Sequence, residues 1–521
     1  MTTLIPRKPY TDEELRQLYP AGLELQLVQV LMRHGERTPV SPRFQHAGLH
    51  PFWPYCSAVK QFRAAVLEDD VDAGVAGVGV GGGSAATKPL GTLAWKRRLE
   101  TFSKADDTAV LAKGSRGELD ALCDMGMLTD PGRATTLRLG QRLRQLYVDR
   151  LHFLPAELKG DDVDRLFYLR ATPIPRALES MQQAFTGLYP DRDRSGKPIT
   201  IVSRAPADET LFPNDGNCRR FAALSRAFAQ RAAERWNDSE ELAYATKKLG
   251  KWMDPDAPRV AVDGRPRLSG VMDTINATLA HGPETRLPAE FYDEKVRRNI
   301  DKVALEEWFA GYHESVEYRT LGIGGLMGDL TTRMVTQAET AGTSGQNGLF
   351  RFGISGCHDT TLAAVLTSLG HSMPTWPPFT SHLAVEMFKK PASDASPTAA
   401  PSLPPPQPAS SSSGWSAYLP SFLSSKPAAP TSIGRKPTPD LTETEKHKMA
   451  GYYVRIRYND EVVTVPGCKA AGKHLDGDES FCTLEAFKAI VDKYTPKNWK
   501  HECRSNLGKP AFPAKLEPSG Y

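Results

Sequence analysis

Three segments of the chain each combine a short apolar strand pattern with a polar turn and a helical pattern. The strand patterns cover Leu23 to Leu31, Asp164 to Leu169 and Leu349 to Ile354. Parallel strands need a long crossover connection, which is usually a helix, so a recurring strand–turn–helix order is typical of a parallel sheet. We therefore predict an α/β fold in which helices flank a mostly parallel sheet.

A long stretch without strand patterns interrupts this order. Between Asn217 and about Gln337, apolar residues recur at helical spacing, as in EKVRRNIDKVALEEWFAGYHESVEY. This pattern predicts a helical cap subdomain over residues 214–344, inserted into the sheet domain. The predicted sheet domain comprises residues 23–213, 345–390 and 450–505, and residues 1–22 precede it as an N-terminal extension.

Two further segments differ from the rest in composition. Residues 71–88 are rich in glycine, but no strand leads into them and no Gly-Lys-Ser/Thr follows, which favours a flexible loop over a phosphate-binding loop. Residues 391–449 are rich in Pro, Ser and Ala, which predicts a disordered insertion. The strand-like segments Ser381 to Lys390 and Gly451 to Asp460 flank it and are expected to pair as an antiparallel hairpin. We interpret an apolar group within the insertion as incidental rather than as a docking element: Trp415, Tyr418, Leu419 and Phe422.

Charge and hydropathy exclude two classes of protein. Lys plus Arg is 65 and Asp plus Glu is 61, a net charge of +4 without long one-sided runs, which argues against nucleic acid as a partner. No apolar run reaches the ~18 residues that a transmembrane segment needs. The N-terminal segment contains acidic residues and lacks an apolar signal core, so we expect a cytoplasmic location, with mitochondrial or secreted locations as alternatives. The oligomeric state is left open.

The first strand is followed directly by the segment LMRHGERTPV, which places Arg33, His34 and Arg37 at the end of that strand. Ligands of open α/β sheets bind outside the carboxyl ends of the strands. Two guanidinium groups beside an imidazole suit a tetrahedral oxyanion, because each guanidinium presents a planar fork of donors. The imidazole can then attack phosphorus, and the pattern predicts covalent phosphoryl transfer.

Polar residues follow the other two strands as well. Arg170 comes directly after the second strand, and His358 and Asp359 open the helical pattern after the third. A His-Asp pair could serve as a helix cap. Polar residues recur at the same predicted sheet edge, and this recurrence favours a shared site that includes Arg170, His358 and Asp359.

Three of these segments resemble a known family. LMRHGERTPV, FYLRATPIPRALESMQQAFTGLYP and GISGCHDTTLAAVLTSLG are similar to the signature elements of the histidine acid phosphatases, a branch of the histidine phosphatase superfamily that also contains phytases. The C-terminal stretches, together with Trp376 to Phe379, are most similar to the lysophosphatidic acid phosphatase type 6 subgroup. The resemblance covers most of residues 23 to 505 and implies a phosphoglycerate-mutase-like fold.

The resemblance also implies roles for the site residues. His34 would be the nucleophile that forms a phosphohistidine, and Arg33, Arg37 and Arg170 would hold the phosphoryl oxygens. His358 would add a donor, and Asp359 would protonate the leaving group. No metal or other cofactor is implied.

The resemblance extends to cysteines. Cys468 and Cys482 match a cysteine pair of the family, and Cys503 lies at a further matching position. A bridge between Cys468 and Cys482 is expected only in an oxidising compartment.

The implied activity is the hydrolysis of a small phosphate monoester, and a lysophospholipid is one candidate substrate. A phytase-like or sugar phosphatase of the same family is the alternative. The superfamily also contains mutases, but the His358-Asp359 element favours hydrolysis. A non-enzymatic anion-binding scaffold is the remaining reading, and the six intact site residues argue against it.

Overall fold

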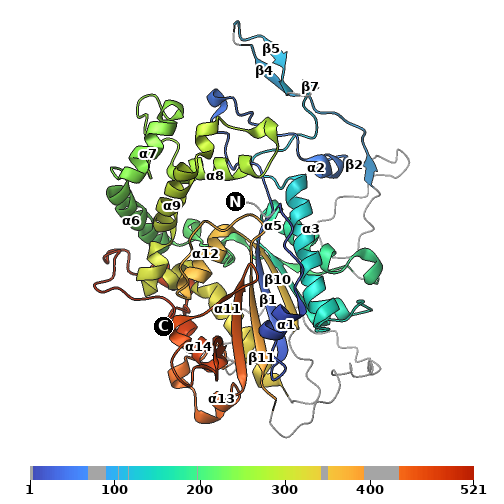
Figure 1. The fold of residues 1–521 in the computed structure, drawn as a ribbon, viewed down its shortest axis with the longest axis vertical. Coiled ribbons are helices and arrows are strands. Elements are labelled where there is room, and N and C mark those ends of the chain that lie inside the picture. The colour runs from blue at the N-terminus through green and yellow to red at the C-terminus, as the bar shows by residue number, and fades with distance from the viewer. Residues whose placement is uncertain are drawn as a thin grey trace, which may run out of the picture.

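The computed structural model describes residues 4–67, 90–103, 105–114, 117–195, 198–341, 350–391 and 433–521. The predicted glycine-rich loop at 71–88 lies outside these residues. Residues 392–432 of the predicted insertion also lie outside them, and so does its apolar group Trp415, Tyr418, Leu419 and Phe422. Figure 1 shows a central sheet with helices on both sides and a further group of helices above it.

The central sheet is mixed. Within the described residues its strand order is β14-β15-β12-β11-β1-β10-β8-β9, and β13 pairs with β12. The strands are β1 (Glu24–Arg33), β8 (Phe167–Ala171), β9 (Ile201–Val202), β10 (Phe352–Cys357), β11 (His382–Lys389), β12 (Tyr452–Tyr458), β13 (Glu461–Val463), β14 (His474–Leu475) and β15 (Asp478–Thr483). β1, β10, β8 and β9 are parallel, as predicted for the motif-bearing strands. From β11 onward the strands pair antiparallel.

Helices cover both faces of this sheet. One layer contains α3 (Asp130–Arg144) and α5 (Pro175–Leu188), and the other contains α11 (Gly325–Thr340), α12 (Asp359–Ser368) and α14 (Leu484–Asp492). Successive side chains of a strand point to opposite faces. Accordingly, Val28, Val30 and Met32 of β1 lie in the core beneath α3 and α5, and Leu27 and Leu31 lie in the core on the other face. The helices confirm the predicted α/β fold.

A cap of helices lies above the sheet (Figure 1). It contains α6 (Arg219–Trp236), α7 (Glu240–Leu249), α8 (Leu268–Leu279), α9 (Glu294–Glu314) and α10 (Val316–Arg319). The predicted cap range of 214–344 extends too far, because α11 packs on the sheet instead: the Gln29 side-chain amide of β1 donates a hydrogen bond to the Leu330 carbonyl at 3.1 Å.

The N-terminal extension is packed against the sheet. It contains α1 (Asp12–Leu18), which begins with a capping box formed by Thr11 and Glu14. Tyr19 donates a hydrogen bond to the buried Glu386 of β11 at 2.5 Å, and Tyr10 donates one to Asp460 at 2.6 Å. Residues 4–22 are therefore part of the sheet domain rather than a separate appendage.

The strands on either side of the predicted insertion pair antiparallel, from Leu383 with Tyr458 to Lys389 with Tyr452, which confirms the predicted hairpin. The prediction of disorder is wrong for residues 433–449. These residues form the turn η10 (Thr438–Asp440) and the helix α13 (Glu443–His447). The physical reason is that Ile433, Leu441 and Met449 bury their side chains in the main core, which the overall Pro/Ser/Ala composition obscured.

The described residues also form shorter elements: α2 (Ser57–Phe62), β2 (Ala65–Leu67), β3 (Leu90–Thr92), β4 (Glu100–Phe102), β5 (Ala109–Leu111), β6 (Lys113–Gly114), β7 (Gly117–Glu118), α4 (Asp162–Leu166) and α15 (Trp499–Glu502). β4 and β5 form a hairpin that projects from the top of the molecule (Figure 1). No helix among the described residues is long and apolar enough to span a membrane.

Six of the seven cysteines form disulfides. The pairs are Cys56–Cys123, Cys218–Cys503 and Cys468–Cys482, and Cys357 is a buried free thiol. The bridge implied for Cys468 and Cys482 is present, whereas Cys503 pairs with Cys218. Disulfides persist mainly in oxidising compartments, so these pairs argue against the expected cytoplasmic location.

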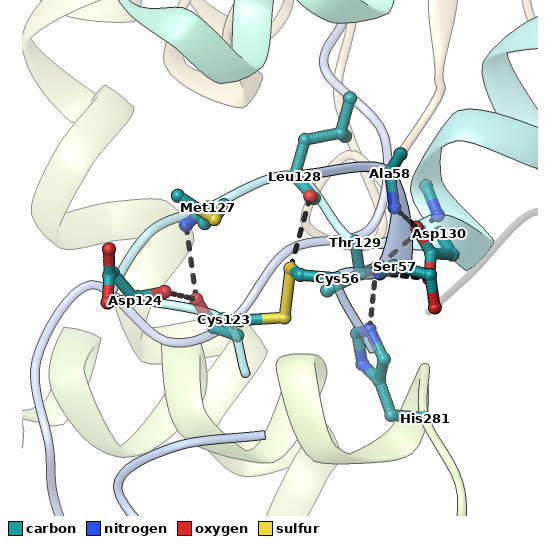
Figure 2. The surroundings of a disulfide bond; sticks show 12 residues. Cys56, Ser57, Ala58, Cys123, Asp124, Met127, Leu128, Thr129, Asp130 and His281 are labelled. Carbon is teal, nitrogen blue, oxygen red and sulfur yellow. Dashed lines mark hydrogen bonds between the residues drawn. A yellow bond between two sulfur atoms is a disulfide. The ribbon is translucent and has the colours of Figure 1, made fainter. Parts of the chain in front are cut away.

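Figure 2 shows the Cys56–Cys123 bridge and the segment that follows Cys123. This segment pairs with the loop that carries Arg37, where the Thr38 amide donates to the Met127 carbonyl at 3.1 Å and the Thr129 amide donates to the Glu36 carbonyl at 3.0 Å. The hydrogen bonds hold the segment against that loop, and the disulfide links it to Cys56.

Candidate active site

The first motif begins where β1 ends. β1 lies between β10 and β11, and the neighbouring strands hold its end: the Arg33 amide donates to the Ser381 carbonyl at 2.8 Å, and the His34 amide donates to the Cys357 carbonyl at 3.0 Å. Arg33 lies in register with Cys357. β8, which pairs parallel with β10 on the side away from β1, ends at the same edge. The ends of three strands therefore meet at the edge that the sequence predicted.

Gly35 allows the loop to pass close to α3. A Cβ atom at Gly35 would overlap the carbonyl oxygen of Gly132 at the start of that helix. The Gly35 amide also donates to the Ser180 hydroxyl of α5 at 3.0 Å. Because the loop is fixed to both helices, the direction of the His34 side chain is fixed as well.

His34 is neutral and has one ring nitrogen available. Its Nδ1 lies 2.9 Å from the Gly35 carbonyl oxygen, which can only accept, so Nδ1 carries the proton and Nε2 carries the lone pair. Nε2 makes no hydrogen bond to any residue that the structure describes, and His34 lines the main cavity. Burial and the nearby Arg176 and Arg37 guanidinium groups hold the pKa of His34 well below its usual value. This is the state that a nucleophilic imidazole requires.

Arg33 and Arg37 are buried beside His34. Arg33 forms an ion pair with Asp359 at 2.7 Å and lies over the Phe379 ring, 4.1 Å from its centroid. Arg37 forms an ion pair with Asp273 of α8 at 2.8 Å, a cap partner that the sequence analysis did not identify. The Nε atoms of both arginines are buried without a hydrogen-bond partner in the described part of the chain. Unpaired buried donors of this kind suit an anion.

Arg170 is not at the cavity, and the structure corrects this prediction. Its side chain is fully buried, pairs with Glu209 at 2.5 Å and contacts the Thr210 hydroxyl at 3.2 Å. Arg170 belongs to β8, and the strand directs its side chain toward the Glu209 segment instead of the cavity, whose lining residues do not include it.

Arg176 supplies the third guanidinium group. It lies in the first turn of α5 and lines the cavity with His34 and Arg37. Burial and the like charge of Arg37 lower the pKa of Arg176 to about 10. The nearby cations repel one another, and a bound anion would relieve this repulsion. The sequence indicated the correct edge for this segment, but the prediction named Arg170 of the strand. The signal it missed is that a residue in the first turn of the following helix faces the same edge.

His358 and Asp359 lie at the start of α12, opposite His34. The rings of His34 and His358 are 5.5 Å apart between centroids, and His358 Nε2 lies 3.1 Å from the Thr172 hydroxyl. Burial and Arg176 lower the pKa of His358 to about 3, so its ring is neutral in the unliganded site.

Asp359 is ionised in this geometry. Its Oδ2 accepts from Arg33 and from the Trp376 indole at 2.9 Å, and its Oδ1 accepts from the Thr360 amide at 2.8 Å. Burial opposes ionisation, but Arg33 and then Trp376 outweigh it and lower the pKa of Asp359 to about 2. The N-termini of α5 and α12 also face this region, which favours a bound anion.

His34, Arg37, Arg176, His358 and Asp359 form one end of a cavity of about 850 Å³ between the sheet edge and the cap, and Arg33 lies behind Asp359 without lining it. That volume is within the range that holds drug-sized ligands and is far more than phosphate alone requires. Much of the remaining wall comes from α6 and α9 and is apolar or aromatic: Phe221, Ala222, Ala229, Ala233, Trp308, Phe309 and Tyr312.

Comparisons with known proteins agree with this geometry. The profile of the histidine phosphatase superfamily (branch 2) matches residues 24–401. A probable acid phosphatase of Schizosaccharomyces pombe is 34% identical over 93% of this chain and 95% of its own length. Human lysophosphatidic acid phosphatase type 6 is 24% identical over 70% of this chain and 74% of its own length.

A solved structure shows the same fold. Hafnia alvei phytase in complex with tartrate has a TM-score of 0.50 at 12% identity and covers 93% of this chain and 99% of its own. The profile match covers the sheet strands β1, β8, β9, β10 and β11, the cap and the residues that line the cavity. The chain therefore belongs to branch 2 of the histidine phosphatase superfamily.

Proposed function

We propose that this protein is an acid phosphatase that hydrolyses phosphate monoesters through a phosphohistidine on His34. The observation that carries the proposal is the free, neutral Nε2 of His34 facing a cavity that also presents Arg37 and Arg176. Guanidinium groups placed around a phosphoryl group stabilise the charge that develops during its transfer. In this proposal Arg176 takes the role that the sequence analysis assigned to Arg170.

The reaction takes two displacements. In the first, the Nε2 lone pair of His34 forms a bond to phosphorus, the ester P–O bond breaks, and Asp359 donates a proton to the leaving alcohol oxygen. In the second, water gives a proton to Asp359 and attacks phosphorus, the P–N bond breaks, and inorganic phosphate leaves. Arg33, Arg37, Arg176 and His358 hold the phosphoryl oxygens throughout.

The substrate brings the proton that Asp359 needs. Asp359 is ionised in the empty site, with a pKa of about 2. A phosphoryl group takes up part of the Arg33 charge and adds negative charge beside the carboxylate, which raises the pKa of Asp359. A phosphate monoester that binds as its monoanion can then pass its proton to Asp359. The second pKa of such an ester is near 6, so kcat/KM is expected to fall as the pH rises above about 6.

The cavity favours an uncharged, partly apolar leaving group. Beyond the phosphate end its charged residues have a small acidic excess, two arginines against three carboxylates: Arg226 and Arg267 against Asp215, Asp263 and Glu307. Arg267 is already paired with Glu307 at 2.7 Å. A lysophospholipid, the substrate in the name of the human relative, fits an apolar wall of this kind. A highly phosphorylated inositol would meet few free cations there, so the phytase-like alternative is less well supported.

Phosphate release from four substrates tests the proposal: 1-acyl lysophosphatidic acid, glycerol 3-phosphate, myo-inositol hexakisphosphate and p-nitrophenyl phosphate. We expect turnover of all but myo-inositol hexakisphosphate, strongest on the acidic side of neutral, and the highest kcat/KM for the lysophospholipid. His34→Ala is the control and should abolish release from every substrate while leaving the unfolding temperature within a few degrees. A folded His34→Ala protein that keeps its turnover would contradict the mechanism.

A further inference from the structure

We propose that Trp376 is a positioning residue for Asp359 and that it links the proton donor to the cap. The inference rests on the proposed function, because it concerns the proton that Asp359 gives to the leaving group. Trp376 lies in the connection between α12 and β11. It is not among the residues that line the cavity, and it reaches the phosphate end only through Asp359.

Trp376 fixes one oxygen of the carboxylate. The buried indole Nε1–H donates to Asp359 Oδ2 at 2.9 Å, and Arg33 reaches the same oxygen at 2.7 Å. The other oxygen, Oδ1, accepts from the Thr360 amide at 2.8 Å. Asp359 is thus held by one cation and two neutral donors.

The neutral donors remain in place when substrate binds. Arg33 must share its donors with the phosphoryl oxygens, since a guanidinium group is drawn to the anionic ligand. The Trp376 indole has a single N–H, already directed at Asp359, and the Thr360 amide belongs to α12. Trp376 therefore keeps the carboxyl group oriented toward the leaving oxygen at the step when Arg33 turns to the phosphate.

The opposite side of the indole packs against the cap. Its ring centroid lies 5.2 Å from that of Phe309 and 6.0 Å from that of Trp308, which meets it edge-on at 90°. Both residues belong to α9 and line the cavity. A leaving group that fills the cavity presses on the side chains that hold Trp376, so occupancy of the cap and the position of Asp359 are mechanically linked.

Other titratable groups around Asp359 remain when the indole is removed. They are Arg33 and Arg37 from the β1 end, Arg176 from α5 and the neutral His358 from α12, with Asp273 of α8 paired to Arg37. The three guanidinium groups still favour the ionised carboxylate, and Asp273 opposes it. Loss of the indole N–H removes one stabilising donor, so the pKa of Asp359 rises and the carboxyl stays protonated to higher pH.

The test compares Trp376→Phe with Trp499→Phe in the full chain. Trp499 is a matched control, because its indole also donates a hydrogen bond of 2.9 Å, to the Leu321 carbonyl, and it does not line the cavity. The pH dependence of kcat is measured on glycerol 3-phosphate, whose alkoxide needs a proton, and on p-nitrophenyl phosphate, whose phenolate leaves without one.

For Trp376→Phe we expect kcat on glycerol 3-phosphate to fall about tenfold, with the basic limb of its pH profile displaced to higher pH. The kcat on p-nitrophenyl phosphate should stay within about twofold of the parent. Trp499→Phe should change neither profile. In an Asp359→Asn background, the Trp376 substitution should cause no further loss on the alkyl ester, since the residue acts through Asp359.

Equal losses on both substrates with an unmoved pH profile would overturn the proposal and leave Trp376 a packing residue. If Trp376→Phe does not fold, the isosteric analogue β-(3-benzothienyl)alanine at position 376 fills the same volume without the N–H and decides the question in the same way. A wrong role for Trp376 can be told apart from a wrong function for the protein. If only the role is wrong, His34→Ala still abolishes turnover, while Trp376→Phe behaves like Trp499→Phe.

Discussion

Arg170 and Arg176 share one segment of the chain and lie in opposite environments. Arg170 forms a fully buried ion pair with Glu209, whereas Arg176 lines the cavity beside His34. A buried ion pair has a structural role, because removing one partner leaves the other as an uncompensated buried charge that destabilises the fold. A guanidinium group at the cavity acts on the charge that develops during phosphoryl transfer. Removal of Arg170 should therefore impair stability, and removal of Arg176 should impair turnover.

Arg176→Ala is expected to lower kcat/KM on p-nitrophenyl phosphate by about 10²- to 10³-fold with little change in the free energy of unfolding. Arg170→Ala leaves Glu209 buried and unpaired and is expected to reduce the free energy of unfolding by about 3–5 kcal/mol. Steady-state kinetics and urea unfolding of both variants give the comparison. A stable Arg170→Ala protein with the larger kinetic defect would restore Arg170 to the site.

At the scale of elements, the pairing of β11 with β12 holds together two segments that are far apart in the chain. Their register runs from Leu383 with Tyr458 to Lys389 with Tyr452, and the Lys390 amide donates to the Gly451 carbonyl at 2.8 Å. Residues 433–449 then pack against the core through Ile433. Residues 392–432 are therefore held at both ends, by β11 on one side and by residues 433–449 on the other.

Because closure entropy changes slowly with loop length, by about 0.6 kcal/mol per halving, residues 392–432 should be dispensable for the chemistry. A variant that joins Pro391 to Ile433 through a short Gly/Ser linker is expected to hydrolyse p-nitrophenyl phosphate within about twofold of the parent rate. Its melting temperature should change by only a few degrees. A matched variant that also removes residues 433–449 should be less stable, since it exposes the apolar site that these residues cover. A folded short-linker variant without turnover would show that residues 392–432 act in catalysis.

At the scale of the whole molecule, the C-terminal segment ties the cap to the sheet domain. Cys503 is bonded to Cys218 at the start of α6. The buried Arg220 of α6 donates to the Lys509 carbonyl at 2.9 Å and the Pro510 carbonyl at 2.8 Å. Further along, the Gly467 amide donates to the Gly520 carbonyl at 2.7 Å, which returns the chain to the sheet domain. The cap that forms the cavity is therefore held by covalent and polar links.

Replacing Cys218 and Cys503 together by Ser should lower the free energy of unfolding by about 2–4 kcal/mol, because the bridge restrains a long loop of the unfolded chain. Their sequence separation is 285 residues, against 14 for Cys468 and Cys482, so the corresponding Cys468/Cys482 variant should lose less. Denaturant unfolding under non-reducing conditions measures both. An unchanged free energy for the Cys218/Cys503 variant would mean that this bridge does not stabilise the cap.

Most of the candidate site could be predicted from the order of elements along the chain. Parallel strands followed by helices bring their carboxyl ends to one edge. This order of elements predicts that Arg33, His34 and Arg37 lie near His358 and Asp359. The α/β class and the β11–β12 pairing follow from the same local patterns of apolar residues, which fix strands and helices by their periodicity.

What only the tertiary structure decided depends on long-range packing. Arg170 points toward Glu209, whereas Arg176 lines the cavity, and no local sequence pattern predicts these directions. The pairing of Arg37 with Asp273 and of Asp359 with Trp376 joins segments distant in sequence. The disulfide partners and the burial of Ile433 and Met449 are likewise set by where the cap and the C-terminal segment come to lie. Sequence periodicity determines the elements and their edge, and three-dimensional packing determines which side chains at that edge meet.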